Sequence, residues 1–200
     1  MITCAVGDEL RFMKPAPHVE VLVTGVGMVE ASSSIARALA QSPYSLVINA
    51  GIAGAFRGKA DIGDGVVVAD EFVELGLETG EPVALPEGAR LVDRVSSDLS
   101  LVDSLVEHGF ASKRGITVSS VTATDRTAAR LAEFDVEIET MEGFAALRAA
   151  EMAGVPAIEV RGISNIVGDR EKSGWNFAAG ITGLSNVLQT LLNVLVRDDG

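Results

Sequence analysis

The sequence predicts one α/β domain over residues 1–200: three layers, with a central mixed, largely parallel sheet flanked by helices. Two observations indicate this fold class. Short apolar runs rich in β-branched residues alternate along the chain with longer segments of helical periodicity. In addition, 48% of the 200 residues are apolar, which is enough to bury a large core. No repeat or linker-like tract divides the chain, so a second domain is not expected.

Seven apolar runs are the expected strands. They are "MITCAV" from Met1, "HVEVLVTG" from His18, "SLVINAG" from Ser45, "GVVVADEFVEL" from Gly65, "KRGITVSSV" from Lys113, "FDVEIET" from Phe134 and "PAIEVRGIS" from Pro156. Helices are expected over Met28 to Gln41, about Asp93 to Glu107, Asp125 to Glu133, Met141 to Ala153 and Asn176 to Val196. The segment "LGLETGEPVALPEGAR" has no period and is predicted to be a surface loop.

Charge and composition exclude several classes of partner. Acidic residues outnumber basic residues 28 to 16 without a basic cluster, so neither nucleic acid nor an anionic membrane is an expected partner. The apolar stretch "GLSNVLQTLLNVLV" is interrupted by polar residues, which argues against a membrane span. One cysteine cannot form an internal disulfide, which fits a reducing cytoplasm, and two histidines without ligand spacing predict no metal site.

Glycines and polar residues gather after the predicted strands, where open α/β sheets bind ligands. Gly25 and Gly27 of "VTGVGMVEA" form either a tight turn or a cradle of backbone N–H groups; Glu30 occupies the third glycine position of a dinucleotide fingerprint, so that motif fails. Gly51 and Gly54 of "NAGIAGAF" are either turn glycines or leave room for a ligand.

Two charged residues stand where apolar neighbours are expected. On a helix advancing about 100° per residue, Glu142 shares a face with small alanines and therefore needs a donor or a ligand. Arg161 interrupts the apolar strand "PAIEVRGIS" and needs a carboxylate, with Glu142 and Glu9 as candidates, or a ligand anion. A purely structural Arg161–Glu142 ion pair is the alternative.

Polar residues follow the last strand. Ser164, Asn165 and Asp169 of "SNIVGDR" are expected in a loop at the ligand edge, or simply in an Asx turn. Trp175 precedes a helix that Asn176 can cap, and is either a core residue or a surface for stacking a purine.

Taken in order, "GVGMVEA", "NAGIAGAF" with "IGDGVVVAD", "TMEG" and "RGISN" resemble the nucleosidase and nucleoside phosphorylase superfamily over almost the whole chain. Within it, "RGISNIVGDREKSGWN" is most similar to the futalosine hydrolases of menaquinone biosynthesis, which release hypoxanthine from a nucleoside, and less similar to the methylthioadenosine and adenosylhomocysteine nucleosidases. The resemblance implies a nucleoside phosphorylase-like fold, a small nucleoside substrate, no cofactor and a homo-oligomer.

The resemblance also implies roles for individual residues. Met141 and Glu142 match the pair that binds the ribose, and Glu9 matches the glutamate that activates water. Arg161 matches an arginine that orders this water and the carboxylates. The other substrate contacts are expected from Gly51, Ile52, Ala53, Thr122, Thr124, Ser164 and Trp175.

Asn165 departs from the adenine-specific relatives, which have aspartate there. Hypoxanthine presents two acceptors, N7 and O6, and a carboxamide NH₂ supplies two donors, so Asn165 favours a 6-oxopurine. Because an amide is not an acid, the leaving base is stabilised either by hydrogen bonding from Asn165 or by protonation from Asp169. Thr122 and Thr124 replace an aromatic residue of those relatives, so the base is expected to lean on Trp175.

Two other functions remain open at this stage. A purine nucleoside phosphorylase needs a cationic phosphate site, for which Arg161 and Arg57 are the candidates, although a glutamate beside the nucleophile repels phosphate. Another 6-oxopurine or methylthioadenosine-type nucleosidase is a variant of the same chemistry. A non-catalytic nucleoside sensor would bind purine without forming product.

Overall fold

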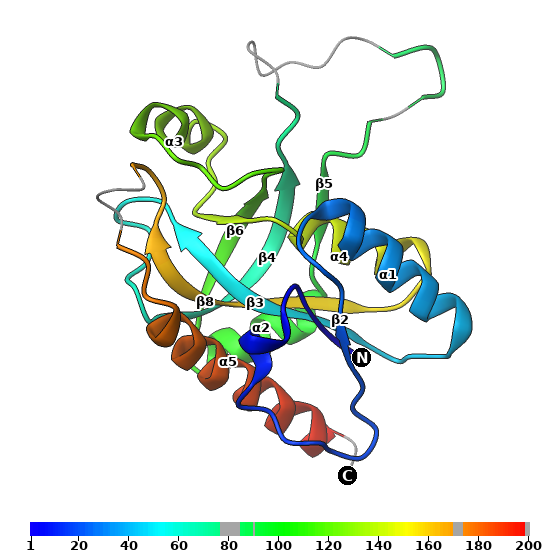
Figure 1. The fold of residues 1–200 in the computed structure, drawn as a ribbon. Helices are drawn as coiled ribbons and strands as arrows, with labels where there is room; N and C mark the ends of the chain where they lie inside the picture. The colour runs from blue at the N-terminus through cyan, green and yellow to red at the C-terminus, as the bar shows by residue number, and fades with distance from the viewer. Residues whose placement is uncertain (77–84, 90, 170–173, 199–200) are drawn as a thin grey trace.

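A mixed sheet forms the centre of the molecule (Figure 1). The computed structural model describes residues 1–76, 85–89, 91–169 and 174–198. Its strands are β1 Ile2–Cys4, β2 Val21–Val23, β3 Val47–Ala55, β4 Gly65–Val73, β5 Arg94–Ser96, β6 Ala111–Thr117, β7 Ile138–Thr140 and β8 Ala157–Ile166. They follow the order β2-β1-β3-β7-β6-β4-β5, and β8 pairs with both β3 and β4. Strand β8 therefore closes a ring with β3, β7, β6 and β4.

Most strand pairs are parallel, as predicted. The antiparallel pairs are β3 with β7, β4 with β5 and β4 with β8. Parallel pairing joins β1 to β2 and β3, β3 to β8, and β6 to β4 and β7. Residues at or after the carboxyl ends of β1, β3, β6, β7 and β8 line one cavity, which is described below.

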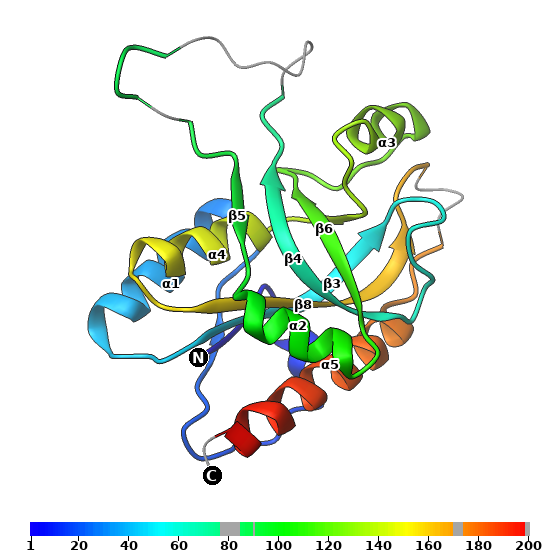
Figure 2. The ribbon, with the colours of Figure 1, turned by 180° about the vertical axis from the view of Figure 1, so that it is seen from behind.

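Helices flank the sheet in the expected layers (Figures 1 and 2). They are η1 Gly7–Leu10, a single 3-10 turn, and α1 Met28–Gln41, α2 Leu99–Glu107, α3 Asp125–Ala132, α4 Gly143–Met152 and α5 Phe177–Asp198. Helices α1 and α4 pack together on one side of the sheet, whereas α2 and α5 cover the other. The predicted fold class is confirmed.

Helix α5 contributes a helical stripe of apolar residues to the core. Leu184, Val187, Leu188 and Leu191 are fully buried and pack with Ile158 and Val160 of β8. Over Phe177–Val196 the helix is long and apolar enough to cross a bilayer by length and composition alone. Its buried residues recur at the spacing of a helix that packs one face on a sheet.

One predicted helix divides into a strand and a shorter helix. Arg94–Ser96 pairs antiparallel with β4 as β5, so the helix expected from Asp93 begins only at Leu99. The carboxylate of Asp98 accepts hydrogen bonds from the N–H groups of Ser100 (3.0 Å) and Leu101 (3.2 Å), which fixes that start. In the predicted loop, residues 85–89 are exposed, while 77–84 and 90 lie outside the described residues.

Candidate active site

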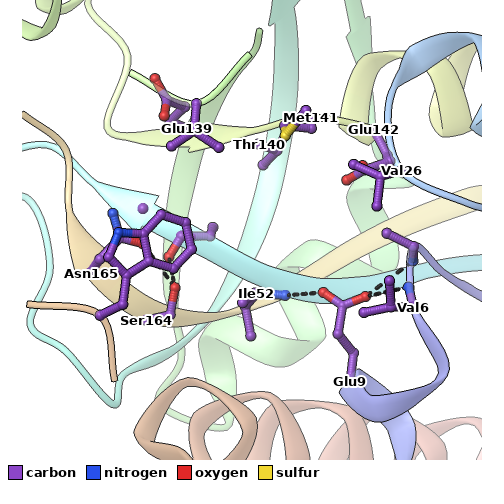
Figure 3. A pocket seen from close by; sticks show the side chains of 15 residues that line it. Val6, Glu9, Val26, Ile52, Glu139, Thr140, Met141, Glu142, Ser164 and Asn165 are labelled. Carbon is purple, nitrogen blue, oxygen red and sulfur yellow. Dashed lines mark hydrogen bonds between the residues drawn. The ribbon is translucent and has the colours of Figure 1, made fainter. Parts of the chain in front are cut away.

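A cavity of about 250 Å³ opens at the carboxyl ends of the parallel strands (Figure 3). Its wall combines three carboxylates, several small apolar residues and one indole. The lining residues are Ala5, Val6, Glu9, Val26, Ile52, Ala53, Gly54, Val121, Glu139, Thr140, Met141, Glu142, Ser164, Asn165 and Trp175. Of the residues predicted from the sequence, Glu9, Ile52, Ala53, Met141, Glu142, Ser164, Asn165 and Trp175 meet there.

Glu9 is held rigidly at one end of the cavity. It lies in η1, directly after β1, and is 6% exposed. Its Oε2 accepts hydrogen bonds from the N–H groups of Ala5 and Val6, both at 3.1 Å, and its Oε1 accepts one from Ile52 at 3.0 Å. Three backbone donors fix both oxygens, so the carboxylate cannot turn away from the cavity (Figure 3).

Arg161 lies beneath this end of the cavity rather than in its wall. A methyl group at Gly51 would overlap the Arg161 guanidinium and lie 2.8 Å from Glu9 Oε1, so glycine is needed where β3 crosses over the arginine. The predicted "turn" glycines Gly51 and Gly54 are in fact inside β3. Gly51 therefore makes room for a protein side chain and does not line the cavity.

The ion-pair partner of Arg161 differs from the prediction. Arg161 Nε donates to Glu159 Oε1 at 2.7 Å, two residues earlier on the same strand, instead of pairing with Glu142 or Glu9. Both side chains are almost completely buried. Although burial favours deprotonation, the surrounding carboxylates of Glu159, Glu142 and Glu9 raise the pKa of Arg161 above its ordinary value. Arg161 thus supplies a fixed positive charge below the cavity.

Glu142 precedes helix α4, which corrects the prediction that it lies within the helix. Its backbone carbonyl accepts from the N–H of Ala146 at 2.9 Å, as the N-cap residue. Its side-chain Oε1 accepts from the N–H of Gly27 at 2.7 Å, at the start of α1. Burial raises the pKa of Glu142, while Arg161 and the Gly27 hydrogen bond oppose that shift. The glycine-rich turn therefore holds a protein carboxylate.

Asn165 and Ser164 lie at the opposite end from Glu9 and Glu142 (Figure 3). Both are within β8, which is longer than predicted, and not in a loop after it. Ser164 Oγ donates to Asn165 Oδ1 at 2.9 Å, so the amide oxygen is occupied. Asn165 Nδ2 lies 3.0 Å from the position that a Cβ on Gly54 would take, which places the amide donor over the cavity floor.

Trp175 is held next to this end through its neighbour Asn176. The Asn176 N–H donates to the Ser164 carbonyl at 2.8 Å, and its Oδ1 accepts from the Ala179 N–H at 3.0 Å. The predicted capping role of Asn176 is confirmed. The cap fixes the backbone beside Trp175, so the indole forms part of the cavity wall.

Three predicted residues, besides Gly51 and Arg161, are not in the wall. Asp169 donates its N–H to Asp125 Oδ1 at 2.9 Å and lies in a separate cavity with Arg57. Thr124 is exposed and caps α3 by accepting from the Thr127 N–H at 3.2 Å. Thr122 is buried behind the wall, where Val121 reaches the cavity instead.

Glu139 is a wall residue that the sequence analysis missed. It is 5% exposed, its Oε1 accepts from the Thr122 N–H at 3.0 Å, and its Oε2 accepts from the Thr122 hydroxyl. Burial raises the pKa of Glu139, and the two hydrogen bonds from Thr122 partly offset this. The alternation of apolar and acidic residues in "FDVEIET" is the pattern of a strand with one solvent-exposed face, so it gives no signal for a buried glutamate, whereas all three residues of β7 are buried.

The charge of the cavity wall determines what it can bind. Glu9, Glu139 and Glu142 are acidic, and none of the described residues that line the cavity is Lys, Arg or His. Each carboxylate has lone pairs beyond those used by the protein. The wall therefore suits a neutral ligand rich in hydrogen-bond donors, and it disfavours an anion.

Comparison with known proteins identifies the family of the chain. Residues 7–196 match the family model of the Phosphorylase superfamily. The chain is 32% identical to the futalosine hydrolase of Thermus thermophilus, covering 86% of this chain and 80% of the relative, and 34% identical to that of Streptomyces coelicolor, covering 88% and 79%. The 5′-methylthioadenosine/S-adenosylhomocysteine nucleosidase of Streptococcus pneumoniae, solved with a transition-state inhibitor, superimposes with a TM-score of 0.80 at 19% identity, covering 97% and 98% of the two chains.

Proposed function

This chain belongs to the phosphorylase superfamily and, within it, to the futalosine hydrolases, and we propose that it hydrolyses the N-glycosidic bond of futalosine. The products are hypoxanthine and dehypoxanthine futalosine, a step of menaquinone biosynthesis. The observation that carries the proposal is the cavity with Glu9 and Glu142 at one end and Asn165 at the other. It offers acceptors to a sugar and donors to an oxopurine.

Glu142 and Met141 bind the ribose. One oxygen of Glu142 is fixed by Gly27, and its remaining lone pairs accept the 2′- and 3′-hydroxyl protons of the sugar. These donors offset the cost of burying a carboxylate whose pKa is already raised. Met141 supplies an apolar surface against the sugar ring.

Glu9 is the general base. As the C1′–N9 bond breaks, its electron pair moves to the base, and the sugar gains oxocarbenium character that the nearby carboxylates stabilise. A water attacks C1′ and passes a proton to Glu9, whose orientation is fixed by Ala5, Val6 and Ile52. The base departs as an anion and takes a proton from solvent water, and Glu9 returns its proton to solvent, so that the products are neutral hypoxanthine and the free sugar. General-base assistance of this kind contributes about 10² to 10⁴ in rate.

Asn165 stabilises the leaving base by hydrogen bonding. Because its Oδ1 accepts from Ser164, its NH₂ is the group that faces N7 and O6 of the purine. The alternative acid, Asp169, lies with Asp125 and Arg57 in another cavity, so proton donation from Asp169 has no geometric support.

Phosphorolysis is the less favoured function. The two arginines that could have bound phosphate are elsewhere: Arg161 is buried and paired with Glu159, and Arg57 lines other cavities. Glu9 and Glu142 would repel phosphate from the anomeric carbon.

We also propose that the chain acts in the cytoplasm as a homo-oligomer. An apolar groove lies between α1 and α4, and its lining includes Met28, Val29, Phe144 and Met152. Val29 and Met152 are 74% and 75% exposed, so a second copy of this chain seated there would bury apolar surface. Light scattering should give a mass above that of one chain.

The test is base release from three nucleosides. Purified protein is incubated with futalosine, inosine and methylthioadenosine, and the released base is followed by chromatography. Hypoxanthine from futalosine is expected. Adenine release from methylthioadenosine alone would contradict both the proposed substrate and the role of Asn165.

A further inference from the structure

Helix α4 begins directly after Glu142, yet the side chain of this residue does not cap the helix. Glu142 is the N-cap residue, and its carboxylate makes no hydrogen bond to the first turn of α4. The first N–H groups of a helix have no acceptor within it, and an N-cap side chain ordinarily accepts from the N–H two or three residues on. Other acceptors therefore hold the first turn of α4.

Two threonine hydroxyls accept from the first N–H groups of α4. The Phe144 N–H donates to Thr117 Oγ1 at 2.8 Å. The Gly143 N–H donates to Thr140 Oγ1 at 3.3 Å. Thr117 ends β6, Thr140 ends β7, and the two residues are paired across these parallel strands. The two strands thus present their hydroxyls together to the start of the helix.

The hydroxyl proton of Thr117 points away from α4. Thr117 Oγ1 donates to Glu71 Oε2 at 3.0 Å and also lies 3.1 Å from Thr140 Oγ1, which is a second possible acceptor. A hydroxyl that gives its single proton to either group keeps its lone pairs for other donors. Thr117 therefore stays an acceptor for the Phe144 N–H whichever of the two receives its proton.

This arrangement leaves the Glu142 carboxylate available to the cavity. Its Oε1 accepts from the Gly27 N–H, and the side chain lies in the cavity wall at the same end as Glu9 (Figure 3). Without the Thr117 hydroxyl, the Phe144 N–H would lose its acceptor. A free N–H in the first turn attracts the carboxylate of its own N-cap residue, because a helix N-terminus favours negative charge. Glu142 would then turn back onto α4 and away from the sugar.

We propose that Thr117 is a positioning residue for ribose binding: by accepting from the Phe144 N–H, it keeps the Glu142 carboxylate free for the 2′- and 3′-hydroxyls of the sugar. This inference rests on the proposed function, since it concerns the ribose end of the same cavity. Thr117 is completely buried and does not line the cavity, so its effect reaches the ligand through α4 and Glu142.

The experiment measures how strongly the protein prefers a ribose that carries both hydroxyls. Dissociation constants for inosine and 2′,3′-dideoxyinosine are obtained for wild-type protein, Thr117→Val, Thr117→Ala and Thr117→Ser. Trp175 is the only tryptophan and lies in the cavity wall, so its fluorescence on stopped-flow mixing reports binding before turnover. Thr3→Val is the matched control, because Thr3 is a completely buried threonine of β1 whose hydroxyl donates to Asn49. Circular dichroism verifies that each variant is folded.

Wild-type protein should bind inosine about 10- to 100-fold more tightly than 2′,3′-dideoxyinosine, the range for hydrogen bonds to a charged group. Thr117→Val and Thr117→Ala should lower that preference about 10-fold by weakening inosine alone, because Glu142 is drawn to the Phe144 N–H. Thr117→Ser, which keeps the acceptor, and Thr3→Val should retain the wild-type preference. In a Glu142→Gln background, Thr117→Val should lower the preference no further, since it acts through that carboxylate.

An unchanged preference in folded Thr117→Val or Thr117→Ala would overturn the proposal. Equal weakening of both nucleosides is the result of a purely structural role and would overturn it too, as would failure of both variants to fold. Equal binding of the two nucleosides by wild-type protein would leave Glu142 without a hydroxyl to position. None of these results depends on hydrolysis. Futalosine hydrolysis with an unchanged preference would remove only the role of Thr117, whereas a lowered preference without hydrolysis would remove only the proposed reaction.

Discussion

The sheet region contains two groups of buried glutamates, which differ in their hydrogen-bond and ion-pair partners. The cavity acids are Glu9, Glu139 and Glu142, and the cluster below the cavity is Glu71, Glu159 and Arg161. In the cluster, Glu71 accepts hydrogen bonds at 3.0 Å from the hydroxyls of Thr117 and Thr140, and Glu159 pairs with Arg161. The cavity acids instead accept hydrogen bonds from backbone N–H groups, and Glu139 also accepts one from the Thr122 hydroxyl.

The difference in partners indicates a structural role for the cluster and a role in binding and catalysis for the cavity acids. Two carboxylates share one arginine in the cluster, so burial, together with Glu159, raises the pKa of Glu71 well above its usual range and favours its neutral form. No residue of the cluster lines the cavity. The cavity acids keep lone pairs directed at a ligand, which is where binding and catalysis are expected.

The largest effect on turnover should come from replacing Glu9, one of the cavity acids. Glu9→Gln keeps the shape and the hydrogen bonds from Ile52 or Ala5 but cannot accept the proton of the attacking water. Turnover of futalosine by the folded protein should fall about 10²- to 10⁴-fold. Because the amide NH₂ faces at least one of the three backbone N–H donors, the free energy of unfolding should also fall, by about 1–3 kcal/mol. Asp8→Asn, an exposed neighbour in η1, is the matched control and should retain activity. Wild-type turnover by Glu9→Gln would remove Glu9 from the mechanism.

An intermediate effect is expected from Gly115→Ala, which disturbs the cluster alone. A Cβ at Gly115 would overlap the carboxyl of Glu71 and lie 2.9 Å from its Oε2. Glu71 cannot move without losing Thr117 or Thr140, so urea denaturation should show a loss of about 1–3 kcal/mol in unfolding free energy. Turnover by the folded fraction should stay within about twofold of wild type.

The control for this variant is Gly7→Ala, whose Cβ would meet Val23 Cγ2 at an ordinary 3.8 Å. It should not destabilise the protein. Equal stability of Gly115→Ala and wild type would show that the cluster is not tightly packed. A loss of turnover without a loss of stability would show that the cluster takes part in catalysis, contrary to the structural role assigned to it.

The smallest effect should be a change in pH dependence on replacing Glu71 by glutamine. The folded-state pKa of Glu71 is raised above 4.5, so its stabilising contribution is complete below that pH and is lost as pH rises through the folded value. Glu71→Gln stays neutral, so its stability relative to wild type should improve as the pH rises above 4.5. Parallel stability curves would contradict a neutral Glu71.

Much of the fold could be predicted because periodicity is local. Helix α1 has the predicted bounds, Met28–Gln41, since it has a clear apolar stripe, Gly27 precedes it and Pro43 follows closely after its end. Strand β5 was missed because Arg94–Ser96 is stabilised by pairing with β4, a contact distant in sequence. The glycines of "NAGIAGAF" were expected either in a turn or as room for a ligand; both lie inside a strand, where Gly51 makes room for the Arg161 side chain and Gly54 lines the cavity.

The site was predicted where a charge stood out from its surroundings. Arg161 and Glu142 interrupted apolar segments, and both are buried as expected. Glu159 interrupts the same strand two residues before Arg161, so the i, i+2 spacing could have identified the ion pair. Glu139 could not be distinguished from exposed Glu residues in the alternation, because burial of both faces of β7 is set by its neighbours β3 and β6.

The most direct test of the central claim is the mass of the sugar product formed from futalosine in phosphate buffer. If Glu9 and Glu142 exclude phosphate from the anomeric carbon and Glu9 activates water, mass spectrometry should show only the free sugar, dehypoxanthine futalosine, and turnover should not depend on phosphate. A sugar phosphate ester, formed only when phosphate is present, would contradict the account and make this chain a phosphorylase.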